Sequence, residues 1–213
     1  MDTRATTKIS SISKKERRNC FIEGILIQLK SMFKLPLFGL NKREGVPSRD
    51  SIKMIFGIGN PEDKYTNTYH NVGFLYIDSQ VKEKMKSYQD FAFSKQGEII
   101  FAKSFTFMNQ SGKSLRQAMK YFGLKPEEVL VVHDDSDLTL GQYKIVFNRG
   151  SAGHKGIDSI ISHLKTKNFF RLRIGVRENE GKAGDFVLKS VSKSGRTTLE
   201  KLFSEIQLFD SSS

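Results

Sequence analysis

Several residues that could carry chemistry fall where strands of this chain are expected to end. Asn60 follows one apolar run, His70 comes a short polar stretch later, and Asp134-Asp135 closes another apolar run. In open α/β sheets, ligands bind beyond the carboxyl ends of the strands, so these positions are candidate site residues. A histidine in a polar loop without an evident packing role can exchange protons near neutral pH. His70 is therefore the strongest single candidate for acid–base chemistry.

The same positions also have structural interpretations. Asp and Asn at strand ends are frequently turn residues, and His133, inside an apolar strand, is interpreted as a hydrogen-bonded core histidine. The carboxylates within His133–Asp137 could instead form a hard-metal or zinc site with that histidine. Gly57–Gly59 is not a dinucleotide-binding fingerprint, because Glu62 occupies the position of the third glycine. Residue types alone leave these interpretations open.

The hydrophobic periodicity predicts the elements that must position these residues. Strands are predicted at 53–59, 98–103, 129–134, 142–147 and 170–176, with helices at 71–88, 109–123, 155–164 and 194–209. The run at 129–134 is continuously apolar, which favours a central strand. This alternation of strands and helices predicts an α/β fold, a single domain with a mixed, mostly parallel twisted sheet and helices on both faces.

Charge and composition narrow the class of protein. The chain has 213 residues and a net charge of +12, which favours a polyanionic partner such as nucleic acid or an anionic membrane surface. The single cysteine, Cys20, cannot form an internal disulfide or a cysteine-type zinc site. No apolar run approaches the ~20 residues of a membrane-spanning helix. These features are typical of a protein that works in a reducing compartment or a mitochondrial matrix.

The first fifty residues differ from the rest of the chain. They contain eleven Lys and Arg against five Asp and Glu, and they are rich in Ser and Thr. We therefore predict a basic N-terminal extension at 1–50, either a mitochondrial targeting segment or a disordered tail, and a folded domain at 51–213. Acidic residues at positions 2, 16 and 23 weigh against a targeting segment, so the predicted location is mitochondrial or cytoplasmic.

Five ordered blocks of the predicted domain resemble the bacterial-type peptidyl-tRNA hydrolase family. The first block comprises Gly57–Pro61, Tyr65 and His70–Gly73, and the resemblance as a whole covers about residues 52–190. The blocks follow one another in the family's order and spacing, which makes the match far more specific than any one motif. The other four blocks are Phe107–Gly112, His133–Leu138, Gly153–Ile157 and Phe170–Gly175.

The resemblance implies a reaction and a set of roles. The family hydrolyses the ester that joins a peptide to tRNA, with a histidine general base and no metal or cofactor. His70 matches the catalytic histidine, and Asp134 matches the carboxylate that orients it. The partner is then peptidyl-tRNA, bound by a protein that we expect to be a monomer. The implied substrate-binding residues are Asn60, Tyr65, Met108, Asn109, His154 and Lys155.

Two positions depart from the family pattern. Arg173 matches a residue that holds a tRNA phosphate, but its usual lysine partner falls at Val146, so Lys144 and Arg149 are expected to replace it. Lys155 stands where the family has an asparagine, which exchanges a neutral amide for a cation without acceptor capacity. A cation near His70 would stabilise a developing oxyanion and disfavour the imidazolium form.

These departures leave two functions to weigh. The first is hydrolysis of peptidyl-tRNA. The second is RNA binding without catalysis, as in plant-organelle relatives of the family that serve in intron splicing, a role that Lys155 and the basic extension would suit. The presence of both His70 and Asp134 favours the hydrolase, because a protein that only binds RNA needs no general base.

Overall fold

The computed structural model describes Pro47 and residues 51–178 and 186–208. Apart from Pro47, the predicted extension at 1–50 lies outside the described residues, so its boundary and any targeting role stay predictions. Among the residues that are described, none of the helices is both long enough and apolar enough to cross a membrane.

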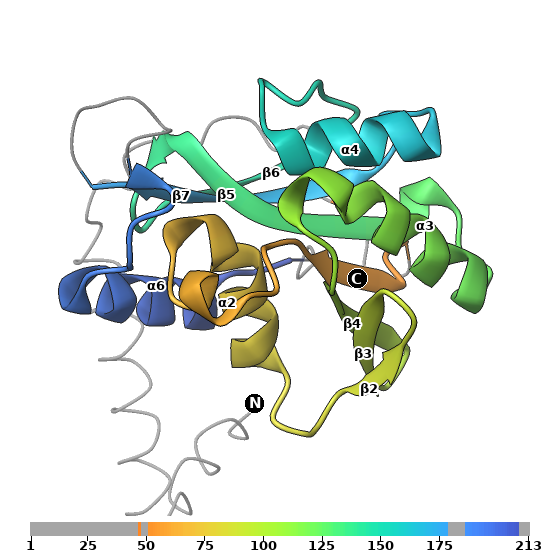
Figure 1. The fold of residues 1–213 in the computed structure, drawn as a ribbon, viewed down its shortest axis with the longest axis horizontal. Coiled ribbons are helices and arrows are strands. Elements are labelled where there is room, and N and C mark those ends of the chain that lie inside the picture. Colours follow the sequence, from red (N-terminus) through yellow and green to blue (C-terminus); the bar gives the residue numbers. More distant parts are fainter. Residues whose placement is uncertain (1–46, 48–50, 179–185, 209–213) are drawn as a thin grey trace, which may run out of the picture. The chain divides into compact units, whose positions relative to one another are not determined.

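A seven-stranded sheet forms the centre of the domain, in the order β2-β3-β4-β1-β5-β7-β6 (Figure 1). The four adjacent strands β4, β1, β5 and β7 run parallel to one another. Strands β2, β3 and β6 pair antiparallel with their neighbours. The prediction of a mixed, mostly parallel sheet is therefore confirmed. The strands are β1 (Met54–Gly57), β2 (Lys86–Tyr88), β3 (Phe91–Gln96), β4 (Ile99–Ser104), β5 (Val129–Thr139), β6 (Tyr143–Phe147) and β7 (Phe170–Arg177).

Helices cover both faces of this sheet, as predicted. Helices α2 (Val72–Gln80) and α6 (Lys193–Glu205) lie on one face, and α3 (Ser111–Phe122) and α4 (Lys155–Leu164) lie on the other (Figure 1). Each layer buries its own core, with Tyr76 and Leu199 in the first and Leu115 in the second. Burial of each large apolar side chain contributes about 1.5–3 kcal/mol. Residues at the carboxyl ends of β1 and β5 are thus held on a rigid frame.

The region after α2 differs from the prediction. The predicted helix at 71–88 ends at Gln80, and the chain then forms the antiparallel hairpin of β2 and β3. The three residues of β2 are all exposed, so this edge strand lacks the apolar–polar alternation that identifies a strand. Met85 packs against the core, and it follows Val81 at the four-residue spacing of a helix face. This spacing explains why the helix was predicted to continue to residue 88. Gln89, with φ of 45°, supplies the hairpin turn.

Element boundaries elsewhere differ by smaller amounts. Helix α3 ends at Gly123 in the left-handed conformation, as the sequence predicts for a C-cap. Strand β5 continues past its predicted end at residue 134 to Thr139, because its polar second half pairs with β7. Helix α6 begins after Ser192, whose hydroxyl caps it, and ends at Glu205 rather than at 209.

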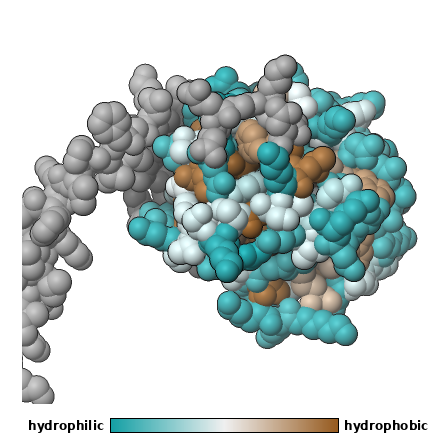
Figure 2. Space-filling model, turned by 60° about the vertical axis from the view of Figure 1, so that its left-hand side comes forward, coloured by the Kyte–Doolittle hydropathy of each residue, from teal (hydrophilic) through white to brown (hydrophobic). Residues whose placement is uncertain are grey.

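The surface of the described region is mainly polar. On the face seen in Figure 2, hydrophilic side chains surround small hydrophobic areas. Phe105 and Phe107 are 43% and 41% exposed, and they flank the segment that leads into η3 (Met108–Gln110). Apolar surface is therefore available beside residues that the sequence assigns to substrate binding.

Candidate active site

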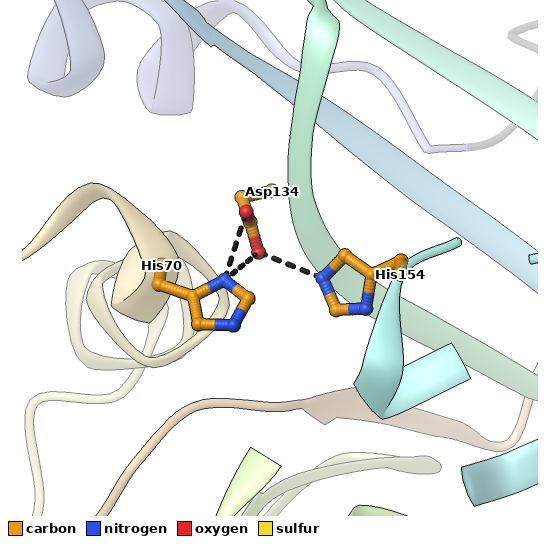
Figure 3. Close-up of side chains that lie close together, drawn as sticks. All are labelled: His70, Asp134 and His154. Carbon is orange, nitrogen blue, oxygen red and sulfur yellow. Dashed lines mark hydrogen bonds and ion pairs between the residues drawn. The ribbon is translucent and has the colours of Figure 1, made fainter. Parts of the chain in front are cut away.

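Three side chains from distant parts of the chain meet at the middle of β5, just beyond the carboxyl end of the neighbouring strand β1. His70 lies in the single turn η2 (Tyr69–Asn71) before α2, Asp134 lies on β5, and His154 precedes α4 (Figure 3). His70 Nδ1 is 2.9 Å from both Asp134 carboxylate oxygens, and His154 Nε2 is 2.9 Å from Oδ1. The two imidazole ring centroids are 5.3 Å apart. The carboxylate of Asp134 is thus shared by two histidines.

Gly73 explains how His70 reaches Asp134. A Cβ atom at Gly73 would lie 2.5 Å from the carbonyl oxygens of Ile58, which directly follows β1, and of Val132, in the first half of β5. Only a glycine allows the first turn of α2 to rest directly on these two backbone segments. Because η2 leads straight into this turn, the close approach brings His70 to the carboxylate on β5.

Hydrogen bonds fix the tautomer of His154. Its Nδ1 atom accepts from the backbone N–H groups of Gly156 and Ile157, at 3.1 and 3.3 Å, and so caps α4. A neutral imidazole carries one proton, so that proton is on Nε2 and is donated to Asp134. His154 uses both ring nitrogens within the protein. It therefore has no ring nitrogen left for a substrate.

The Asp134 carboxylate is held in its ionised form. Its side chain is 4% exposed, and this burial by itself would raise the pKa of the carboxyl. Attraction to His154 and His70 and the hydrogen bonds from both rings outweigh the burial, and hold the pKa of Asp134 well below its usual range. An ionised Asp134 is an acceptor only, so His70 donates its Nδ1–H to it. The His70 Nε2 atom then carries a lone pair.

These three residues also have the composition of a metal site. Ligand atoms of His70, Asp134 and His154 lie within 4.8 Å of one another. A metal on His154 Nε2 would require the proton to move to Nδ1, where it would face two backbone N–H donors. The cap on α4 therefore opposes metal binding by this cluster.

Asn60 is oriented by a residue that the sequence does not single out. The Asn60 N–H donates to Asn71 Oδ1 at 2.8 Å, and Asn71 Nδ2 donates to the Asn60 carbonyl at 2.9 Å. Asn60 Oδ1 in turn accepts the Met108 N–H at 2.9 Å. This leaves the Asn60 Nδ2 group as a donor without a partner among the described residues. Asn71 follows His70 directly, so its place in the His70–Gly73 block was the available signal.

The remaining candidate residues take different positions. Met108 is buried where α4 begins, and a Cβ at Gly156 would lie 2.5 Å from its sulfur, so this glycine permits the contact. Tyr65 is half-buried, with the Lys64 ammonium 4.9 Å from its ring centroid. Asn109 and Lys155 are both exposed. The structure brings Met108 close to the start of α4, but no hydrogen bond or ion pair joins the side chain of Asn109 or Lys155 to the histidine–aspartate cluster.

Two of the predicted phosphate-binding residues lie on neighbouring strands, Arg173 on β7 and Lys144 on the edge strand β6, and Arg149 follows the end of β6. Arg173 pairs directly with Lys144 across the two strands, whereas Val146 pairs with Arg171. Arg173 donates its Nε–H to Asp135, which leaves its terminal nitrogens available. Lys144 and Arg149 are exposed. A pair of cations therefore exists at Arg173 and Lys144, two residues along the strand from Val146.

Arg171 supports the loop that carries His154. Its side chain is buried and donates to the Gly150 carbonyl at 2.9 Å. Burial, together with repulsion from Arg173 and Arg149, lowers the pKa of Arg171 to about 10. The guanidinium remains charged at neutral pH, so it holds the loop without being free to bind a phosphate.

His133 is a buried, hydrogen-bonded core histidine, as predicted, but only one of its two ring nitrogens has a partner in the described part of the chain. Its Nδ1–H donates to the Asp134 carbonyl at 2.6 Å, but its buried Nε2 has no partner among the described residues. Burial holds the pKa of His133 well below its ordinary value, and the nearby His154 acts in the same direction. His133 is therefore a neutral side chain in the folded protein.

This burial predicts a pH dependence of stability. Unfolded His133 binds a proton below about pH 6.5 and the folded form does not, so stability falls as pH drops through that value. When the pH is lowered from about 7.5 to 5.5, the free energy of unfolding should decrease in both proteins. We expect this decrease to be about 1 kcal/mol smaller in His133→Asn than in the parent. Urea unfolding at both pH values measures this difference. His163→Asn is the control, because His163 is exposed and also bonds a backbone carbonyl through Nδ1. Equal losses in the parent and His133→Asn would contradict the assignment.

Comparisons with known proteins identify the family of this chain. The family model described as peptidyl-tRNA hydrolase matches residues 54–209. The peptidyl-tRNA hydrolase of Sulfurihydrogenibium sp. is 42% identical over 160 residues, 71% of this chain and 85% of that protein. That of Exiguobacterium sibiricum is 37% identical over 164 residues, 72% and 89% of the two chains. The crystal structure of the Acinetobacter baumannii enzyme superposes with a TM-score of 0.65 at 26% identity, and the match covers 75% of this chain and 86% of that one. With most of the described domain matched in sequence and in fold, the chain belongs to the peptidyl-tRNA hydrolase family.

Proposed function

We propose that this chain hydrolyses the ester between peptide and tRNA in peptidyl-tRNA, with His70 as the general base. One observation carries the proposal. The His70 Nδ1–H is committed to an ionised Asp134, so the lone pair is on Nε2, and the ring is 16% exposed at the carboxyl end of the sheet. A lone pair on an accessible imidazole nitrogen is what activation of water requires.

The proposed reaction needs only water and the ester. His70 Nε2 removes a proton from water as the oxygen attacks the ester carbonyl, which forms a tetrahedral oxyanion. The imidazolium is stabilised by Asp134 and returns the proton to the departing ribose oxygen as the ester C–O bond breaks. The products are a peptide with a free carboxylate and a tRNA with a free hydroxyl.

Asn60 is proposed to bind the reacting carbonyl. Because its Oδ1 is occupied by the Met108 N–H, its free Nδ2 group is the part that a substrate can meet. A fixed amide donor of this kind stabilises negative charge that develops on a carbonyl oxygen. We propose that exposed Asn109 and half-buried Tyr65 contact other parts of the substrate.

The resemblance implies that His154 binds substrate. Its contacts in the structure suit it better to orient Asp134. Its tautomer is fixed by the N-terminus of α4, and its Nε2–H holds one carboxylate oxygen. We propose that it prevents rotation of the carboxylate away from His70. All residues of this catalytic arrangement come from one chain, so a monomer would suffice for activity.

Arg173, Lys144 and Arg149 are proposed to bind tRNA phosphates. The cross-strand pair Lys144 and Arg173 supports this role, because directly opposite side chains lie within reach of one phosphate group. Phosphate contacts of this kind position the nucleic acid without reading its sequence. Lys144 would then supply the charge that Val146 does not.

Replacing Lys144 by alanine should weaken tRNA binding and reduce its salt dependence. Loss of one phosphate contact lowers the slope of log Kobs against log salt by about 0.7–0.9. Binding measured at several salt concentrations tests this, with Lys86→Ala as a control for net charge, because Lys86 is exposed on the opposite edge strand. Identical slopes for the two variants would place Lys144 away from phosphate.

The variant Lys155→Asn is included in the same salt series, because Lys155 could either contact a tRNA phosphate or act electrostatically on His70. It is exposed at the first position of α4, directly after His154. If Lys155 contacts phosphate, Lys155→Asn changes the salt slope. If it acts on His70, the acidic limb of the pH–rate profile moves to higher pH in Lys155→Asn, because the cation that disfavours imidazolium is gone.

One assay separates the hydrolase from an RNA-binding protein without catalysis. The purified chain is incubated with N-acetyl-aminoacyl-tRNA, and the release of free tRNA is followed. The proposal requires turnover under conditions in which the tRNA is bound. Binding without release would establish the alternative.

A further inference from the structure

Residues 186–192 run beside the loop that carries His70. The His70 N–H donates to the Val187 carbonyl at 2.7 Å, and the Tyr69 N–H donates to that of Lys189 at 3.3 Å. In the opposite direction, the Val191 N–H donates to the Asn67 carbonyl at 2.7 Å. We call residues 186–192 together with the first turn of α6 the brace. The brace therefore contacts the backbone of the candidate general base itself.

Helix α6 anchors this segment. The Ser192 hydroxyl accepts the Gly195 N–H at 2.9 Å and donates to Glu178 at 2.8 Å. The Arg196 guanidinium donates through Nη2 to Asn67 Oδ1, which ties the first turn of α6 to the His70 loop. Packing adds to this tie, because Tyr69 and Val191 belong to the same buried core.

The His70 loop depends on such outside contacts. Element η2 is one turn of three residues, and its N-cap, Thr68, makes no side-chain cap hydrogen bond. A single 3-10 turn of this length has little stability of its own. Its end is fixed by the start of α2, so the brace is what holds its beginning. Misplacement of a catalytic group by about 1 Å can lower a rate 10²-fold.

We propose that the brace sets the position of His70 relative to Asp134, with Asn67 and Arg196 as the positioning residues. The inference rests on the proposed role of His70 as general base. Neither Asn67 nor Arg196 touches the reacting atoms. Their contact instead joins the two segments whose backbones pair around residues 67–70.

A matched pair of variants on α6 tests the proposal in the full chain. Arg196→Ala and Lys201→Ala each remove one exposed cation from the same helix, but within the described part of the chain the Lys201 ammonium forms an ion pair only with Glu205, at 4.0 Å. Loss of a hydrogen bond to a charged group should lower kcat of Arg196→Ala about 3- to 10-fold, with KM unchanged. Lys201→Ala should match the parent. Asn67→Ala should equal Arg196→Ala, and the double variant should be no slower, because the two residues act through one contact.

A second measurement is independent of activity. Hydrogen exchange at the His70 amide, which donates to Val187, should be about 3- to 10-fold faster in Arg196→Ala than in Lys201→Ala. Faster exchange with unchanged kcat would overturn the positioning role. Equal exchange in the two variants would overturn the brace itself. A raised KM with a reduced salt slope, and no effect of Asn67→Ala, would show that Arg196 binds tRNA phosphate instead.

Arg196→Lys provides a final check. A lysine keeps the charge but cannot reproduce the geometry of a guanidinium, so partial recovery of kcat is expected. Should the parent protein prove inactive, the exchange data still decide whether the brace orders the His70 loop. Failure of the proposed function and failure of this inference are therefore distinguishable.

Discussion

Replacement of His70 by alanine is expected to lower kcat for release of tRNA by about 10²–10⁴-fold, the usual contribution of a general base. The effect should fall on kcat because His70 Nε2 is the accessible nitrogen whose lone pair can take a proton from water. Affinity for tRNA should change little, because the cations proposed to bind phosphate lie on β6 and β7. Single-turnover hydrolysis and a separate tRNA-binding titration measure the two quantities.

Two controls make this result interpretable. His163→Ala removes an exposed histidine from α4, and its rate should equal that of the parent. Unfolding by urea should show that His70→Ala remains folded, since the half-buried ring contributes little to the core. Retention of the parental rate in a folded His70→Ala protein would remove His70 from the mechanism.

The second large effect is expected for Asp134→Asn, which should slow hydrolysis by up to about 10⁴-fold. The reason is the fixed tautomer of His154, whose Nε2–H requires an acceptor. The amide oxygen of the substituted side chain will therefore face His154, and its NH₂ group will face His70. His70 must then accept at Nδ1 and carry its proton on Nε2, where no lone pair remains for water.

If the tautomer of His70 limits the Asp134→Asn variant, a second substitution at His154 should restore part of its hydrolysis rate. A loss of negative charge alone would not be corrected in this way. His154→Asn keeps a side-chain oxygen to cap α4 but removes the N–H donor that points at residue 134. In the double variant with Asp134→Asn, the amide can turn its oxygen to His70 and restore the useful tautomer. We expect the double variant to be about 10-fold faster than Asp134→Asn alone. A double variant as slow as Asp134→Asn would refute the tautomer argument.

The family and the layered α/β fold could be predicted from the amino-acid sequence, and its resemblance to the family proposes His70 and Asp134 as the principal residues. Continuous apolar runs predicted the parallel strands, and the blocks around His70 and Asp134 predicted the catalytic pair. These features can be recognised from the sequence because a buried strand, or a motif at a strand end, consists of consecutive residues. Strand β2 was not predicted because its three residues are all exposed, so no buried face imposes a pattern.

The contacts between these residues become visible only in the folded chain. His154 is separated from Asp134 by 20 positions, and only folding shows that its ring caps α4 and holds the carboxylate together with His70. The pairing of Lys144 with Arg173 depends on strand register, and the contact between Asn67 and Arg196 spans 129 positions. Tautomers, register and loop positions follow from distances between segments that are remote along the chain. No pattern of neighbouring residues encodes those distances.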